Sequence, residues 1–178
     1  MIDPKIVEEI VKEGIQETAL FVVDITVTPD NRIVVEIDND EGVDIDRCMS
    51  LHHFIESRLD RDVEDYELEV GSAGITSPFK VVRQYQKNIG NEVEVLTRTG
   101  VKHNGILKAA DDKAFSLTVT KKVKPEGAKR KIEVEDKFIV TITKKVKTET
   151  SKRKVEVSED LAFGYDEIKY TKYLIRFK

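Results

Sequence analysis

The sequence predicts an α+β protein with two domains: a three-stranded sheet carrying two helices, followed by a small all-β barrel. Helical and strand periodicities alternate over residues 1–75, whereas later periodic segments alternate almost only at period two. The sign of the net charge changes at nearly the same place. Residues 1–79 contain 20 Asp+Glu and 6 Lys+Arg, whereas residues 80–178 contain 14 Asp+Glu and 24 Lys+Arg. A chain divided so sharply indicates two units that face different partners.

The first domain is predicted to have the order α-β-β-α-β. Asp3 is placed to cap a first helix with Pro4 at its first position, where the missing N–H costs nothing. A turn at residues 29–31 joins two alternating strands, and an acidic loop, residues 38–46, leads into a second helix and a third strand. The positions expected to face inward are Val7, Ile10, Val11, Ile15, Val23, Ile25, Val27, Ile33, Val35, Ile37, Cys48, Leu51, Ile55, Leu59, Tyr66, Leu68 and Val70.

A junction and a short helix separate the two domains. Small residues and a proline follow the third strand, and we expect a helix over residues 79–86 with Val82 and Tyr85 facing inward. The predicted segments are therefore the acidic domain 1–75, the junction and helix 76–90, and the barrel 91–178. The residues assigned to the interdomain junction are Gly71, Ser72, Gly74, Ile75 and Pro78.

Short period-two segments predict the strands of the barrel, an architecture that removes sheet edges by closure. They lie near residues 93–95, 106–107, 115–119 and 173–177. An insertion of about residues 120–157 interrupts this domain, and within it residues 120–134 recur as residues 143–157 with eleven of fifteen positions identical. Each copy is predicted to be a β-hairpin, so the insertion is a tandem pair of extended hairpins.

These hairpins concentrate positive charge, because residues 121–154 hold 13 Lys+Arg against 5 Asp+Glu. Lysines on a hairpin also protect a strand edge from aggregation, but the excess here is larger than that role needs. We therefore predict contact with the phosphate backbone of a nucleic acid. The candidate contact residues are Lys121, Lys122, Lys124, Lys129, Arg130, Lys131, Lys144, Lys145, Lys147, Lys152, Arg153 and Lys154.

Nothing in the sequence nominates a catalytic centre, a cofactor site or a metal site. The acidic loop fails the calcium-binding EF-hand pattern, and Asp44 or Asp46 is expected instead to cap the second helix. Adjacent His52 and His53 would point in different directions on that helix, and Cys48 lies among apolar positions. We therefore expect neither an enzyme nor a small-molecule substrate.

Composition also predicts the compartment. The sequence has no stretch of about 18 uncharged apolar residues, and its N-terminus lacks the basic and then apolar order of a secretory signal. The single cysteine has no partner for an internal disulfide. The expected setting is the reducing cytoplasm, away from membranes.

The order of parts resembles the ribosome maturation factor RimP family. The resemblance rests on residues 66–79, YELEVGSAGITSPF, on residues 37–43, IDNDEGV, and on residues 92–111, which look like the first half of an Sm-like barrel. In the junction, Ala73 replaces a proline of the family and Ser77 replaces an arginine. The other positions of the junction pattern that this chain retains are Ser72, Gly74, Ile75 and Pro78. The duplicated hairpins lie outside the common family pattern.

The resemblance implies a monomeric, non-enzymatic assembly factor that binds the immature small ribosomal subunit in the bacterial cytoplasm and leaves before translation. Contacts with small-subunit ribosomal proteins and ribosomal RNA are implied as well. The charge distribution is compatible with both contacts, since the acidic domain would attract a basic ribosomal protein and the basic domain would lie against RNA phosphates.

Three alternatives stay open at this point. The two halves of the chain could simply attract each other. The barrel could belong to a stand-alone Sm-like RNA-binding or RNA-chaperone module that assembles as a ring. The acidic loop could serve a small metal-dependent enzyme through Asp38, Asp40, Asp44 and Asp46.

Overall fold

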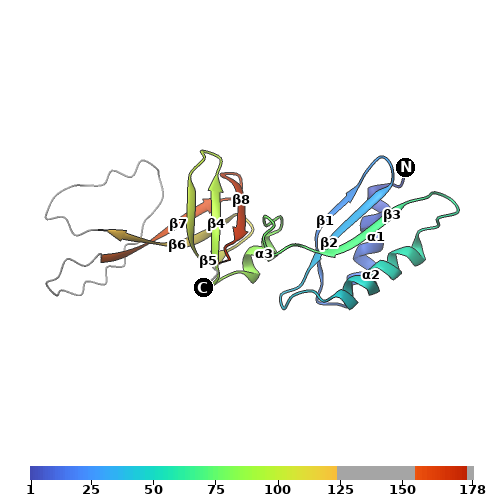
Figure 1. The fold of residues 1–178 in the computed structure, drawn as a ribbon, viewed down its shortest axis with the longest axis horizontal. Coiled ribbons are helices and arrows are strands. Elements are labelled where there is room, and N and C mark those ends of the chain that lie inside the picture. The colour runs from blue at the N-terminus through green and yellow to red at the C-terminus, as the bar shows by residue number, and fades with distance from the viewer. Residues whose placement is uncertain (124–154, 176–178) are drawn as a thin grey trace. The chain divides into compact units, whose positions relative to one another are not determined.

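The computed structural model describes residues 1–123 and 155–175, drawn in colour in Figure 1. The chain divides into two compact units, Met1–Gln84 and Tyr85–Lys178, which we call the first and the second unit. The division falls inside the short helix α3, Val82–Lys87. The finer limits of the acidic domain, the junction and the barrel stay a prediction.

The first unit has the predicted order α-β-β-α-β. An aspartate caps each helix as predicted: the Asp3 carboxylate accepts the backbone N–H of Lys5, and of the two candidates for the second helix it is Asp44 whose carboxylate accepts the N–H of Arg47. Each carboxylate satisfies an otherwise unpaired helical donor and meets the positive end of the helix dipole. The elements are α1 (Pro4–Ile15), β1 (Phe21–Val27), β2 (Arg32–Asp38), α2 (Ile45–Arg58) and β3 (Glu67–Ser72).

The central strand of the first unit is β2, which pairs antiparallel with β1 and parallel with β3. Its residues Ile33, Val35 and Ile37 are fully buried and pack in one core with α1 and α2. Figure 1 shows both helices on the same side of this sheet. The alternate residues of β2 therefore face away from the helices.

A single asparagine holds the beginning of β2 to two other segments. Asn31 adopts a positive φ of 60°, a conformation that asparagine tolerates better than most residues. Its side chain accepts the backbone N–H of Ile2 at 2.9 Å and donates to Glu64 at 3.1 Å and to the carbonyl of Asp65 at 3.0 Å. The N-terminus and the approach to β3 are thus tied to the β1–β2 turn.

The described residues of the second unit form a five-stranded antiparallel sheet with the order β7-β6-β5-β4-β8, in which β7 and β8 are the edge strands. The α+β class and the strand-rich second domain are therefore confirmed, whereas closure of these strands into the predicted Sm-like barrel stays a prediction. The strands are β4 (Glu92–Thr97), β5 (Lys102–Ala110), β6 (Ala114–Val123), β7 (Val155–Gly164) and β8 (Ile168–Tyr173).

Aliphatic and aromatic side chains share the core of this unit. Val93, Val95 and Leu107 are fully buried. The ring of Tyr85, from α3, packs against Phe115 with a centroid distance of 4.9 Å, so this helix residue faces inward as predicted. Aromatic pairs at such distances add to the free energy gained from burying their area.

Two predicted elements are misplaced along the chain, each for a local reason. The short helix begins at Val82 rather than at residue 79, because the Gln84 side-chain carbonyl accepts the backbone N–H groups of Lys80 and Val81 just before it. The predicted last strand, near residues 173–177, shares only Tyr173 with β8, which spans Ile168–Tyr173, and residue 177 lies outside the described residues. The pairing with β4 is used up there, because the backbone N–H of Leu174 bonds to the carbonyl of Glu92, the first residue of β4. Beyond that point β4 offers no further partner.

Gly105 permits a close approach between β5 and β6. A Cβ at this position would lie 2.6 Å from the backbone oxygen of Thr118, a contact that side-chain rotation cannot relieve. By contrast, a Cβ on Gly71 in β3 would meet nothing within 4 Å.

We predict that Gly105→Ala destabilises the second unit by about 1–3 kcal/mol, the usual cost of forcing an extra carbon into a packed region. Amide hydrogen exchange resolved by residue measures this loss in β5 and β6. Gly71→Ala is the matched control and should leave exchange in all strands near native. Native-like protection of β5 in Gly105→Ala would show that the two strands accommodate the extra carbon without cost, and would contradict the prediction.

Candidate functional site

Most of the predicted nucleic-acid contacts lie outside the described residues. Lys121 and Lys122 belong to β6, whereas the other ten lie in residues 124–154. Those ten are Lys124, Lys129, Arg130, Lys131, Lys144, Lys145, Lys147, Lys152, Arg153 and Lys154. The described residues show where this segment joins the second unit, while the contacts themselves stay a prediction.

The segment 124–154 is joined to the two strands of an extended ribbon. Strands β6 and β7 pair over ten residues, from Ala114 opposite Gly164 to Val123 opposite Val155. Strand β5 pairs with β6 only as far as Thr118, so residues 119–123 of β6 pair with β7 alone within the described chain. We call this part, residues 119–123 with 155–159, the β6–β7 ribbon; Figure 1 shows it leaving the sheet.

The positive charge of the second half is concentrated in the part of the sequence that connects the two strands of the ribbon. In the described part of the second unit, residues 85–123 and 155–175, nine Lys+Arg balance nine Asp+Glu. Residues 124–154 contain 11 Lys+Arg and 5 Asp+Glu. The sheet thus carries no net charge, and the chain places its cationic segment between the two strands of the ribbon.

Lysines on the sheet itself are partly neutralised by a neighbouring carboxylate. Glu94 in β4 accepts a hydrogen bond from the Tyr170 hydroxyl at 2.8 Å, and the ammonium groups of Lys102 and Lys172 lie 3.6 and 3.5 Å from the same oxygen. The hydrogen bond from Tyr170, aided by the two lysines, lowers the pKa of Glu94 below its ordinary value. This region of the sheet is therefore a weak candidate for binding phosphate.

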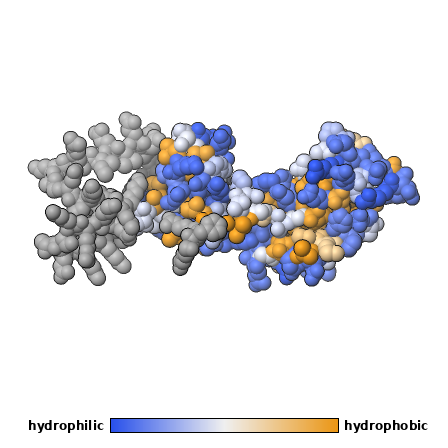
Figure 2. All heavy atoms as spheres, in the orientation of Figure 1, coloured by the Kyte–Doolittle hydropathy of each residue, from blue (hydrophilic) through white to orange (hydrophobic). Residues whose placement is uncertain are grey.

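The first unit presents acidic residues on the sheet face opposite its helices. Asp24 in β1 lies directly across from Glu36 in β2, and Glu67 and Glu69 follow on β3. We call these four residues the acidic sheet face. The described cations on this face are Arg32, which pairs with Glu69 at 3.1 Å, and Lys80. In Figure 2 hydrophilic residues dominate the visible surface of the first unit, with smaller apolar patches between them.

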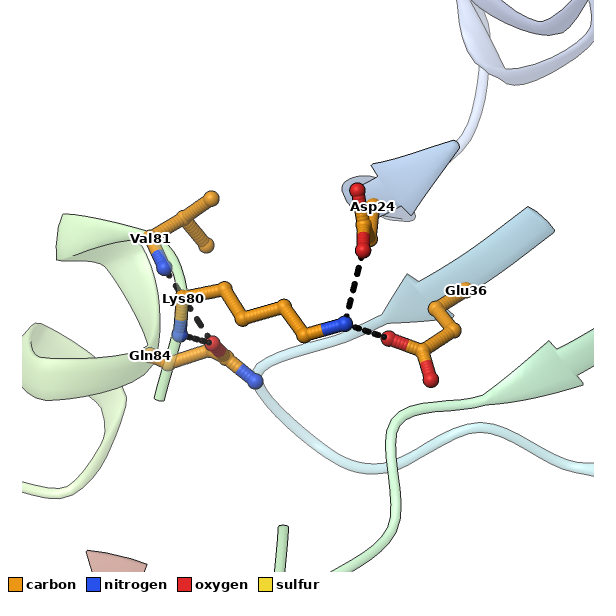
Figure 3. Close-up of polar contacts among 5 residues, drawn as sticks. All are labelled: Asp24, Glu36, Lys80, Val81 and Gln84. Carbon is orange, nitrogen blue, oxygen red and sulfur yellow. Dashed lines mark hydrogen bonds and ion pairs between the residues drawn. The ribbon is translucent and has the colours of Figure 1, made fainter. Parts of the chain in front are cut away.

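Lys80 connects the junction to the acidic sheet face, as Figure 3 shows. Its ammonium nitrogen lies 2.7 Å from an oxygen of Asp24 and 2.7 Å from an oxygen of Glu36. The hydrogen bond to Asp24 and then that to Glu36 raise the pKa of Lys80 above its ordinary value. The cation is thus shared equally by two strands.

Arg83 adds a second attachment between the same segment and the first unit. Its guanidinium donates to both carboxylate oxygens of Asp40, at 3.3 and 3.0 Å, and lies 4.5 Å from the centre of the Phe21 ring. The bidentate geometry suits guanidinium better than ammonium, and the ring adds a cation–π contact.

Sequence reasoning missed Lys80 and Arg83. A signal was available, since these are the first basic residues after Arg61, and they follow the acidic stretch directly. Their partners could not be read from spacing, because Lys80 is separated from Asp24 by 56 positions and from Glu36 by 44.

The predicted junction residues form an exposed turn between β3 and this attachment. The Ala73 backbone N–H still bonds to Ile37, and the Ser77 N–H closes a turn on the carbonyl of Gly74 at 2.8 Å. The backbone conformations of Gly71 and Gly74 lie outside the positive-φ region, so their special freedom is not used. Ile75 is 66% exposed at the tip of the turn.

The chemically reactive residue types of the first unit have structural partners. His52 and His53 both lie near Glu56, at 3.5 and 3.6 Å. Burial raises the pKa of the Cys48 thiol, which makes it a poorer nucleophile. Among the described residues, no three His, Cys, Asp or Glu side chains are grouped to hold a metal ion. In the same part of the chain, no helix is long and apolar enough to cross a membrane.

We predict that Glu94→Gln destabilises the second unit at pH 7 by no more than about 1 kcal/mol, since the pair with the lysines is partly solvated. A carboxylate with a lowered pKa stabilises the fold above its unfolded pKa, and that contribution is lost as pH falls through the folded pKa. The difference between Glu94→Gln and the native protein should therefore vanish in acid. Thermal unfolding at several pH values measures it, and a difference that persists in acid would contradict an ionic origin.

Comparison with known proteins bears on both units. The model of the RimP N-terminal domain family matches residues 6–76. A ribosome maturation factor RimP of Porphyromonas gingivalis is 48% identical over 131 residues, covering 74% of this chain and 86% of the relative. The RimP of Christiangramia forsetii is 36% identical over 132 residues, covering 74% of this chain and 83% of the relative.

A third relative, the RimP of Flavobacterium psychrophilum, is 37% identical over 106 residues, covering 59% of this chain and 69% of the relative. The family-model match lies within the first unit, Met1–Gln84. On this evidence the chain belongs to the ribosome maturation factor RimP family.

Proposed function

We propose that this protein is a non-enzymatic ribosome assembly factor that binds the immature small ribosomal subunit in the cytoplasm and promotes its maturation. Membership of the RimP family carries the proposal, since the relatives are named ribosome maturation factors. It acts as a monomer and needs no cofactor or small-molecule substrate.

The separation of charge supports a division of labour between the two units. The acidic sheet face would repel RNA and attracts a lysine-rich or arginine-rich ribosomal protein. The segment 124–154, with its 11 Lys+Arg, contacts ribosomal RNA through phosphates and releases condensed counterions on binding. Phosphate contacts position the protein without reading base sequence.

A stand-alone RNA-binding or RNA-chaperone module is the second candidate. The observation that favours it is the β6–β7 ribbon, whose two strands belong to the second unit and connect a neutral sheet to a cationic segment of the chain. Such a module would bind free RNA and assembled particles alike. The two candidates therefore differ in which particle they select.

We predict that the protein co-sediments with isolated small subunits, that it does so less with fully assembled ribosomes, and that added salt weakens this binding because part of it is electrostatic. Sedimentation of both particles side by side at two salt concentrations measures this. Equal binding to both particles would support the second candidate, and so would binding to free RNA alone.

We predict that the double substitution Lys129→Glu/Arg130→Glu weakens binding to the small subunit and lowers the slope of log K against log salt by about 1–2, because two phosphate contacts are lost. Lys113→Glu/Lys169→Glu makes the same charge change at two exposed positions of the second unit, in the β5–β6 turn and in β8, and serves as the control. The same loss in both variants would mean that net charge, rather than the basic segment, determines binding.

A further inference from the structure

The facing pair Asp24 and Glu36 requires a cation. The two residues are direct partners in the antiparallel β1–β2 ladder, where side chains of like charge destabilise the pairing. In this chain Lys80 supplies the cation and binds both carboxylates at the same distance of 2.7 Å. The position between the two strands is therefore built for one ammonium or guanidinium group, and an ammonium group occupies it.

Lys80 belongs to a short segment, residues 80–84, that is held together by hydrogen bonds of its own. The Gln84 side-chain carbonyl accepts the backbone N–H groups of Lys80 at 2.7 Å and of Val81 at 3.3 Å, and Gln84 itself is 5% exposed. Arg83 of the same segment binds Asp40. We call residues 80–84 the strap, because these contacts hold it on the first unit as one piece.

The contacts of the strap are open to competition. The side chains of Lys80, Asp24 and Glu36 are 41%, 42% and 34% exposed, so water and a second cation can reach the carboxylates. Ion pairs with this exposure contribute little free energy and weaken with salt. A lysine or arginine side chain presented by a bound partner, with a high local concentration, can replace Lys80 at modest cost.

We infer that the strap can be displaced from the acidic sheet face. A cationic side chain of a basic protein partner then takes the place of the Lys80 ammonium group between Asp24 and Glu36. Binding of that partner and release of the strap are then coupled, and each must weaken the other equally. The inference rests on the proposed function for the partner's identity, a lysine-rich or arginine-rich ribosomal protein. RNA does not fit the surface, because phosphates and carboxylates repel each other.

The first test compares Lys80→Met with Lys5→Met in the full-length protein, using decalysine as the probe. Both substitutions remove one positive charge from the first unit, but Lys5 is exposed on α1 and touches neither Asp24 nor Glu36. Lys80→Met should bind decalysine about two- to fivefold more tightly than Lys5→Met, the fold-change expected when one exposed ion pair no longer competes. Equal affinities of the two variants would overturn the inference.

The second test follows the strap itself. Exchange of the Lys80 and Val81 amide protons, which Gln84 holds in the free protein, should accelerate when decalysine is added to the native chain. The double variant Asp24→Asn/Glu36→Gln removes the shared contact and should abolish this acceleration. If the amides stay equally protected with and without decalysine, the strap is a permanent part of the first unit and the inference fails.

These tests are separate from those of the proposed function. Decalysine binding and amide exchange involve no ribosomal particle, so a protein that fails to sediment with small subunits could still show the coupling. Conversely, normal sedimentation with no difference between Lys80→Met and Lys5→Met would leave the assembly function intact and remove only the strap.

Discussion

Strand β2 pairs with both of its neighbours, and its strict alternation determines the two faces of the first unit. On one side Ile33, Val35 and Ile37 form the fully buried centre of the core beneath α1 and α2. On the other side Glu36 belongs to the acidic sheet face. A shift of one residue in its register would expose the aliphatic residues and bury a carboxylate. Core stability and surface charge are thus linked through the same strand.

Charge is organised differently in the two units. In the first unit acidic residues are spread over a sheet face and are partly paired with Arg32 and Lys80. In the second unit the described residues balance to zero, and the cationic excess lies between Val123 and Val155. Opposite charges that are kept on separate units favour contact with two chemically different surfaces of one large particle. They also raise the rate of encounter with such a particle.

Local signals in the sequence predict much of this fold. The two aspartate caps, the period-two strands of the first unit and the inward Tyr85 follow from side-chain chemistry within a few residues. The strap could not be predicted in this way. Its contacts depend on the register that places Asp24 across from Glu36, and on a return of the chain to those strands dozens of residues later. Non-local ion pairs leave no periodic trace in a single sequence.

The β6–β7 ribbon has a consequence for how the chain tolerates change in length. Val123 and Val155 are direct partners in its last described rung, so the two ends of the segment 124–154 are attached to neighbouring positions of one ladder. For a loop whose two ends are fixed, the entropic free energy of closure rises by only about 0.6 kcal/mol for each doubling of its length. The first copy of the 23-residue repeat begins at Thr120 in β6 and the second copy ends at Val157 in β7, so the added length falls between the two strands of the ribbon. The end of the ribbon is accordingly a permissive insertion point, where an affinity tag or a second binding module could be grafted without repacking either core.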